Sequence, residues 1–167
     1  MMTNLKRVGM ISGLCIIDQT IKIVIDKWLM RSRLEIEHIF GFHPKLNTQQ
    51  LSIFNNELGL GLGIGVLNVI NIILLIVIIA FYVYLKRKYN DNKLVDPAMI
   101  MFTSGVVCSL IDKIFWGGSL DYILFFRQIS DMKDIYLLAG GVLIIVFMIR
   151  QDIEDKKGKA NKQSQAE

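Results

Sequence analysis

The stretch that decides the fold class is apolar and free of charge: residues 67–85 read LNVINIILLIVIIAFYVYL. At about 1.5 Å of rise per residue, a helix from Ile64 to Leu85 is long enough to cross a hydrocarbon core of about 30 Å with some tilt. The composition agrees, since 53% of the residues are hydrophobic and the 20% that are charged gather between apolar runs. The sequence therefore predicts a membrane protein that crosses the bilayer several times.

Three further apolar runs predict spans of their own. The first contains Asp18 and Lys22, and the last is short, so its helix should begin near Asp134. The expected spans are Val8 to Ile25, Ile64 to Leu85, Pro97 to Trp116 and Ile135 to Ile149. The expected fold class is an all-α membrane protein with four transmembrane helices, in a single domain over residues 1–150.

Basic residues lie mainly before the first span, between the second and third, and after the fourth. The positive-inside rule then places both termini in the cytoplasm. This asymmetry and contact with anionic lipid headgroups account for the net charge of +4, so we expect no nucleic-acid partner. The polar tail, Gln151 to Glu167, is expected to be disordered.

The longest segment outside the membrane, Leu29 to Gly63, has turn signals and two short apolar runs. We expect strands at Ile36 to Phe40 and Leu51 to Phe54, forming a small extracytoplasmic β element between the first two spans. The glycines from 59 to 65 lack the βαβ context of a nucleotide-binding loop, which favours flexible backbone and close packing. The second outer segment, Gly117 to Lys133, has aromatic residues typical of the membrane interface.

Two aspartates, Asp121 and Asp134, lie at the expected edges of the third and fourth spans. A carboxylate near hydrocarbon costs roughly 2.5 kcal/mol or more, so an acid at that depth is a functional candidate. Two carboxyl groups about 3 Å apart would share a proton, one acting as base towards a water and the other as acid, and they would titrate as a unit. The alternative is that both are interfacial charges or helix caps.

Other polar residues fall inside the spans. Asp18, Lys22 and Asp26 follow i, i+4, i+8 spacing, which places them on one helical face. Adjacent Asp112 and Lys113 should have different partners, and we expect Asp112 to reach Lys22. A structural ion pair is the favoured interpretation of Lys22.

The remaining reactive residues give weaker signals. Cys15 and Cys108 lie within spans, where neither a disulfide framework nor a metal site is expected. His38 and His43 lack the further ligands that a metal site needs. Serine catalysis is disfavoured because we identify no His or Lys arranged as a base, and the serines weighed are Ser104, Ser109 and Ser119.

These residues together resemble a known family. The run Asp18-Gln-Thr-Ile-Lys22 resembles the D-Q-x-x-K motif of lipoprotein signal peptidase, the type II signal peptidase of bacteria. Leu110-Ile-Asp112-Lys113 and Leu120-Asp121-Tyr122 resemble its G-N-x-x-D-R and V-x-D-F motifs, with the same nine-residue interval between the acids. Asp134, with Leu137 and Gly140, resembles its F-N-x-A-D-x-x-I-x-x-G motif, and Asn56 stands where the family has an asparagine. The similarity spans most of residues 8 to 149.

The resemblance implies an aspartyl protease of the bacterial inner membrane that removes the signal peptide of lipid-modified prolipoproteins just before the diacylglyceryl-cysteine. Asp121 and Asp134 would be the catalytic pair, acting without metal or cofactor. Supporting residues would be Asn56, Ser109, Asp112 and Lys113 at the site, and Asp18 and Lys22 in the fold. The expected partners are diacylglyceryl-modified prolipoproteins and membrane lipids, and we expect a monomer.

The chain departs from the family pattern near the expected site. Cys108-Ser109 replaces Gly-Asn, and Lys113 replaces an arginine whose planar fork a lysine cannot reproduce. The family's Phe-Asn-x-Ala becomes Ser130-Asp131-Met132-Lys133, so Asp131 could compete with Asp134. The thirteen-residue interval from Asp121 to Asp134 also looks short for the family.

Two alternatives to a protease remain. One is a paralogue that binds lipidated peptides without cutting them. The other is a small transporter that uses Asp18, Lys22 and Asp112 as a polar path.

Overall fold

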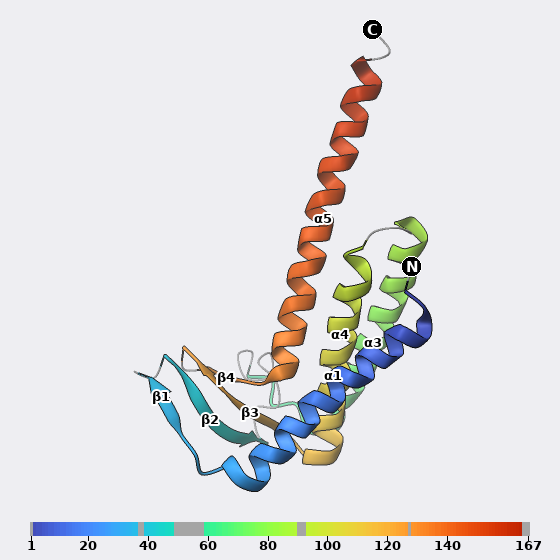
Figure 1. The fold of residues 1–167 in the computed structure, drawn as a ribbon. Helices are drawn as coiled ribbons and strands as arrows, with labels where there is room; N and C mark the ends of the chain where they lie inside the picture. The colour runs from blue at the N-terminus through green and yellow to red at the C-terminus, as the bar shows by residue number, and fades with distance from the viewer. Residues whose placement is uncertain (1, 37–38, 49–58, 90–92, 127, 165–167) are drawn as a thin grey trace.

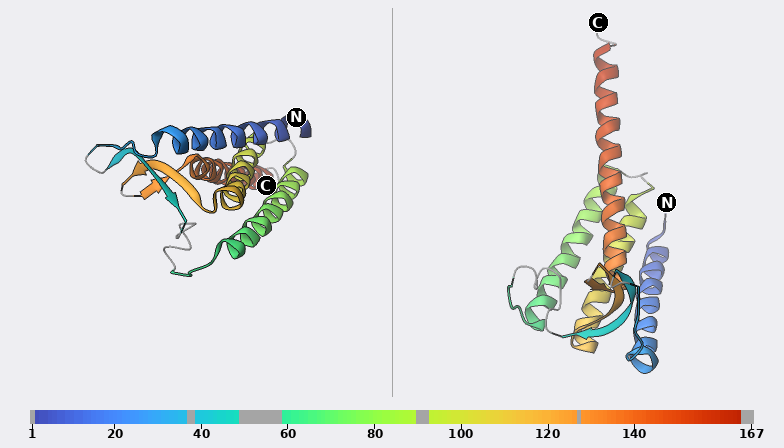
Figure 2. Two further views of the ribbon diagram at one scale, coloured as in Figure 1. Left: turned by 90° about the horizontal axis from the view of Figure 1, so that it is seen from below. Right: turned by 90° about the vertical axis from the view of Figure 1, so that its left-hand side faces the viewer.

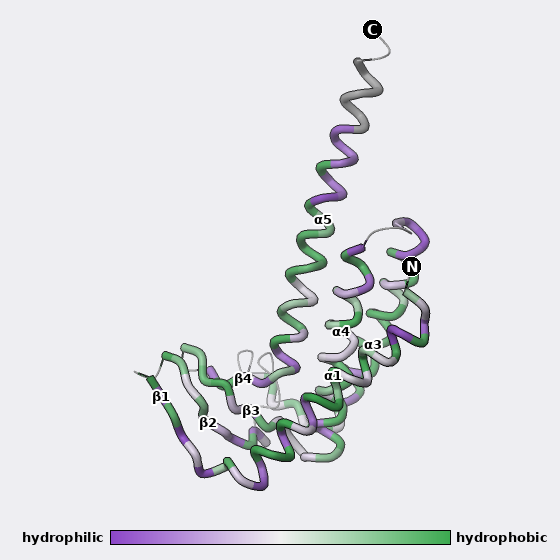
Figure 3. Tube along the Cα trace, in the orientation of Figure 1, coloured by the Kyte–Doolittle hydropathy of each residue, from purple (hydrophilic) through white to green (hydrophobic). Residues whose placement is uncertain are grey.

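The computed structural model describes residues 2–36, 39–48, 59–89, 93–126 and 128–164. Within these ranges, four helices are long and apolar enough to cross a membrane, which confirms the expected number of spans. Their order along the chain is α1 (Asn4–Val24), α3 (Ile64–Lys88), α4 (Val95–Ile111) and α5 (Met132–Ser164). Apolar residues dominate the middle of these helices, as the colouring of Figure 3 shows.

The bundle has two different ends. The N-terminus lies at one end, towards which the C-terminal part of α5 also points, and the sheet lies at the other (Figures 1 and 2). Basic residues close the last turn of α3 near the first end, where cations are favoured by the helix dipole; they are Lys86, Arg87 and Lys88. Both termini therefore lie on the side of the bundle away from the sheet.

Two helices end in a π-helical turn. α1 continues into η1 (Ile25–Leu29), and α4 continues into η2 (Asp112–Trp116). Because a π turn is wider than an α turn, it changes the face on which later residues emerge. The expectation that Asp26 shares a face with Asp18 and Lys22 is wrong, since Asp26 lies in η1 and is exposed while the other two are fully buried.

α5 is longer than expected. It continues past Ile149 to Ser164 and projects beyond the other helices in Figure 1, so the tail that we expected to be disordered is helical as far as Ser164. Local pairing accounts for part of this, because Lys156 and Asp152 form an i,i+4 ion pair of 2.7 Å. Gln151 also donates to Glu154 at 3.2 Å.

The β element is larger than expected. It is a four-stranded antiparallel sheet in the order β1 (Leu34–Ile36), β2 (Phe40–Asn47), β3 (Ser119–Phe125) and β4 (Gln128–Ser130). Two of its strands, β1 and β2, lie between the first two spans as expected, and β3 and β4 come from the second outer segment. The strand expected at Leu51 to Phe54 lies outside the described residues.

The helices pack closely around α4. One cluster joins α3, α4 and α5, and a second joins α1, α4 and α5. Gly105 allows α4 to approach α5, because a Cβ there would stand 2.6 Å from Cγ of Leu137 and 3.1 Å from the backbone oxygen of Lys133. This contact fixes the start of α5 beside the end of α4.

Candidate active site

Asp121 is carried by β3, which begins directly after η2. Gly117 makes the turn between them with φ 62°, a left-handed conformation that glycine adopts without a Cβ clash. Asp121 is paired with Lys45 across the strands, and the register between β2 and β3 shifts between Phe42 and Lys45. Pro44, which has no N–H to donate to the ladder, lies within this bulge. Asp121 therefore emerges from a sheet, where we had expected the edge of a helix.

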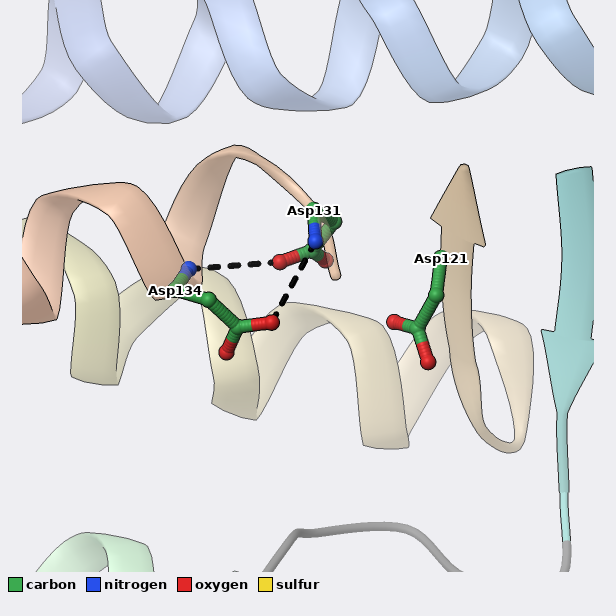
Figure 4. Close-up of side chains that lie close together, drawn as sticks. All are labelled: Asp121, Asp131 and Asp134. Atoms are coloured by element: carbon green, nitrogen blue, oxygen red, sulfur yellow. Dashed lines mark hydrogen bonds between the residues drawn. The ribbon is translucent and has the colours of Figure 1, made fainter. Parts of the chain in front are cut away.

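Asp134 lies in the first turn of α5, three residues after Asp131. The Asp134 backbone N–H donates to Oδ1 of Asp131 at 3.3 Å, and the Asp131 N–H donates to Oδ2 of Asp134 at 3.2 Å. This reciprocal arrangement, drawn in Figure 4, follows the pattern of a capping box. It holds the Asp134 carboxylate at the start of the helix and satisfies two backbone donors that the helix itself leaves free.

The structure brings three carboxylates together at this end of the bundle. One oxygen from each of Asp121, Asp131 and Asp134 lies within 4.8 Å of the others. In Figure 4 the Asp121 side chain points from β3 towards the Asp131–Asp134 pair. The expected pair is thus assembled, although a third acid stands beside it.

Asp121 is held by neutral donors. Its Oδ1 accepts from Ser119 Oγ at 2.6 Å, and its Oδ2 accepts from Asn47 Nδ2 at 3.4 Å. The residue is 8% exposed, and this burial raises the pKa of the Asp121 carboxyl above its ordinary range. Lys133 and the Ser119 hydrogen bond oppose the shift without cancelling it. Asp121 can therefore take up a proton more readily than an exposed aspartate.

Asp131 has a different environment, although it is fully buried. Burial alone would raise its pKa, but the ammonium groups of Lys133 and Lys22 outweigh it and hold the pKa of Asp131 below its ordinary range. Lys22 Nζ lies 2.7 Å from Oδ2 of Asp131, and Lys133 Nζ is in direct contact with the same oxygen. These ammonium groups occupy the position that a cation would take beside Asp131, so this acid is a charged, structural member of the cluster.

The buried network beneath the cluster confirms one expectation. Lys22 Nζ lies 2.9 Å from Asp18 and 2.6 Å from Asp112, and the side chains of all three are fully buried. Gln19 ties the same network together, donating to both carboxylates and accepting from the Trp116 indole at 3.0 Å. Asp112 thus reaches Lys22 as expected, and the network joins α1 to the end of α4.

Lys113 faces away from this network, as its position next to Asp112 predicted. Its Nζ donates to Ser109 Oγ at 2.6 Å, and the same hydroxyl accepts from Asn71 of α3 at 3.0 Å. Ser109 and Lys113 therefore connect α4 to α3.

Two of the serines weighed for catalysis have a lysine beside them, which sequence reasoning did not identify. Lys113 contacts Ser109, and Lys133 Nζ lies 2.5 Å from Ser119 Oγ. Lys113 is four residues from Ser109 on continuous helical turns, whereas Lys133 is fourteen residues from Ser119 in sequence and reaches it only through the sheet. An ammonium that also contacts the carboxylates of Asp112, Asp121 and Asp131 is unsuited to accept a proton from a hydroxyl.

Some candidates lie elsewhere. Asn56 and His38 fall outside the described residues. His43 contacts Glu35 across β1 and β2 through a ring nitrogen. Cys15 and Cys108 are free thiols with Sγ atoms 3.5 Å apart between α1 and α4, a proximity that the sequence alone did not indicate.

Sequence reasoning missed several residues of the site. Asn47, Ser119 and Lys133 contact Asp121, and Asn71 contacts Ser109. Sequence reasoning named Asp131 but not its role as a helix cap, although an acid three residues ahead of Asp134 is the spacing of a capping box. Asn47 and Asn71 carried no such signal.

The fold and the site define a four-span membrane protein with a buried carboxylate cluster at the sheet end of its bundle. A family model described as Signal peptidase (SPase) II matches residues 10–150. This chain belongs to that family.

Individual relatives agree with this assignment. The chain is 27% identical over 84 residues to a lipoprotein signal peptidase of Clostridium tetani (strain Massachusetts / E88), a match that covers 46% of this chain and 53% of that protein. The chain thus spans about half the length of that curated relative. Two solved structures of a bacterial membrane enzyme share the fold. One has a TM-score of 0.65 at 20% identity, covering 89% of this chain and 90% of the other. The second has a TM-score of 0.68 at 21% identity, covering 87% and 93%.

Proposed function

We propose that this protein is a membrane aspartyl endopeptidase that removes signal peptides from lipid-modified prolipoproteins, cutting just before the diacylglyceryl-cysteine. Family membership supports the reaction class, and the Clostridium tetani relative is named for it. The aspartic mechanism rests on this chain's own residues.

The observation that carries the proposal is the separation of the two carboxylates. An oxygen of Asp121 and an oxygen of Asp134 lie within 4.8 Å. A water donates its two hydrogen bonds at a roughly tetrahedral angle, so with bonds of about 2.8–3.0 Å it can bridge carboxylate oxygens about 4.5–5 Å apart. One water therefore fits between Asp121 and Asp134 without movement of the backbone.

The chemistry that follows is water activation by a carboxylate pair. One ionised carboxylate takes a proton from the water as its oxygen attacks the scissile carbonyl carbon. The other carboxyl, protonated, donates its proton to the carbonyl oxygen. Collapse of the tetrahedral intermediate breaks the C–N bond, and the proton taken from water passes to the leaving amine. The raised pKa of Asp121 suits it to carry a proton through this cycle.

The shape of the molecule beside the pair supports a lipidated substrate. A cavity of about 880 Å³ lies between η1, the adjoining turns of α1 and the first three strands of the sheet. It is lined mainly by apolar side chains, among them Ile21, Ile25, Phe42 and Ile123. Ile123 and its neighbour Tyr122 follow Asp121 on β3, so an acyl chain in this cavity would lie close to the pair. We infer that the cavity receives acyl chains of the substrate.

The proposed orientation places the site on the outer face. Both termini lie away from the sheet, and basic residues cluster at their end of the bundle. A lipid-anchored precursor would then reach the pair from the outer leaflet. The transport alternative gains no support, because Asp18, Lys22 and Asp112 are fully buried and pair with one another.

The experiment is cleavage of a diacylated precursor peptide by the purified protein in lipid nanodiscs, with the products identified by mass. The proposal predicts one cut immediately before the modified cysteine and inhibition by a cyclic peptide inhibitor of this family. The same peptide without its lipid is the matched control and should be cut poorly. Binding of the diacylated peptide without any product would overturn the proposal in favour of the non-cleaving paralogue.

A further inference from the structure

Lys133 is an unusual neighbour for a pair of catalytic acids. It is 6% exposed, and its Nζ lies 3.2 Å from Oδ2 of Asp112 and 3.7 Å from Oδ1 of Asp121, besides its contact with Asp131. Lys133 also donates to Ser119 Oγ, which in turn donates to the same Asp121 oxygen at 2.6 Å. A full positive charge therefore acts on Asp121 both through space and through one hydroxyl.

The 3.7 Å separation matters. It exceeds the range of a hydrogen bond, so the ammonium acts on Asp121 electrostatically and takes up none of the lone pairs that remain beside the Ser119 and Asn47 hydrogen bonds. Asp131 makes this possible, because it takes the direct contact with Lys133 and holds the ammonium back. Asp131 is itself held by Lys22 and by the cap that it shares with Asp134.

The two charges also occur together in the sequence. They stand at the two positions where the family motif described above has Asn and Ala, and together they add no net charge. The two side chains are in direct contact, so each compensates the charge of the other in a buried site, where loss of one partner of an ion pair is costly. We therefore treat Asp131 and Lys133 as one functional unit.

We propose that Lys133, held at its distance by Asp131, is a positioning residue that keeps the Asp121–Asp134 pair singly ionised in its buried site. This inference rests on the proposed function. Burial favours the state in which both carboxyls are protonated, and this state cannot activate water. The nearby Lys133 ammonium favours ionisation of one carboxyl and so opposes the effect of burial. Asp131 prevents the cation from closing on Asp121 and blocking it.

Other charged groups surround Lys133 and Asp131 and also affect the titration of the Asp121–Asp134 pair. They are Asp18 and Lys22 of α1, Asp112 and Lys113 of η2, Asp134 of α5, and the exposed Lys45 opposite Asp121 on β2. None of these changes in the variants below, so a difference between variants reports Lys133 and Asp131.

The test is the pH profile of kcat/KM for a diacylated precursor. Lys133→Met should move the acid limb up by about one pH unit, because one nearby opposite charge shifts a carboxyl by about 1–3 units. Asp131→Asn should do the opposite, moving the acid limb down while lowering the maximum, because the freed ammonium closes on Asp121. Lys133→Arg should keep the wild-type limb.

A double variant guards against loss of folding. Asp131→Asn with Lys133→Ala removes both charges together, so it should insert and unfold like the wild type. Its acid limb should lie above that of the wild type but below that of Lys133→Met, because the Asp131 charge that raises the pKa of Asp121 is lost as well. Lys156→Met and Asp152→Asn, on the exposed part of α5, are the matched controls and should leave the profile unchanged.

Two results would overturn the inference. One is an equal loss of kcat/KM at every pH in Lys133→Met and in the double variant, which would mean that Lys133 and Asp131 have only a structural role. The other is a shift in the same direction for Lys133→Met and Asp131→Asn. A wild-type protein that does not cut at all would instead refute the proposed function.

Discussion

Replacing Lys22 by Met is expected to destabilise the fold severely. The Lys22 ammonium lies 2.9, 2.6 and 2.7 Å from carboxylates of Asp18, Asp112 and Asp131, and all four side chains are fully buried. Removing one partner of a buried ion pair costs about 3–5 kcal/mol, because the remaining charge is left without compensation. Here three carboxylates would lose their shared cation, so we expect a loss of at least about 3 kcal/mol.

The assay is denaturant-induced unfolding of the purified variants in detergent micelles, compared as free energies of unfolding. Lys27→Met is the matched control, since Lys27 is exposed on η1 and its loss should change stability by no more than about 0.5 kcal/mol. Lys22→Met combined with Asp112→Asn should be less destabilised than the sum of the single variants, because the two residues interact. A Lys22→Met protein as stable as Lys27→Met would refute the view that this network joins α1 to α4.

Three further outcomes are expected. Because burial raises the folded-state pKa of Asp121, the folded protein binds more protons than the unfolded chain just above the ordinary pKa of an aspartate. The contribution of Asp121 to stability should therefore fall as pH rises through that window. In thermal unfolding, the melting temperature of Asp121→Asn should lack this fall; an unaltered dependence of melting temperature on pH would contradict the raised pKa. Gly105→Ala should cost about 1–3 kcal/mol in thermal unfolding by forcing α4 from α5, whereas Gly9→Ala, which meets open space, should not destabilise; equal effects would refute the close approach. Val24→Trp, which narrows the apolar cavity, should raise KM more for a precursor with long acyl chains than for one with short chains, and equal KM values would exclude acyl chains from it.

The spans and the polar network could be read from the sequence for clear physical reasons. A charge-free run such as residues 67–85 has few alternatives to a membrane helix. A buried Lys22 needs an acid partner, and Asp112 in another span was an available one. The approximate place of Asp121 and Asp134 followed from the same boundaries.

The sheet and the immediate surroundings of Asp121 could not be read in this way. β3 is buried along most of its length, so it lacks the alternation of apolar and polar residues that identifies a half-exposed strand. Without β3, nothing in the spacing places Ser119 beside Lys133, or Asn47 beside Asp121. These contacts depend on the pairing of segments distant in sequence, and the bulge between Phe42 and Lys45 adds a register shift that no local pattern predicts.

The most direct test of the account is the rate at which Asp121→Asn and Asp134→Asn variants cut a diacylated precursor in nanodiscs, with Asp152→Asn as the control on the exposed part of α5. An amide can neither take a proton from the water nor hold one for the scissile carbonyl. One acid or base group contributes about 10²–10⁴-fold to the rate of an enzyme. The account therefore predicts that each active-site variant loses cleavage by at least about a thousandfold while remaining folded and able to bind the precursor. Normal cleavage by either folded variant would contradict it.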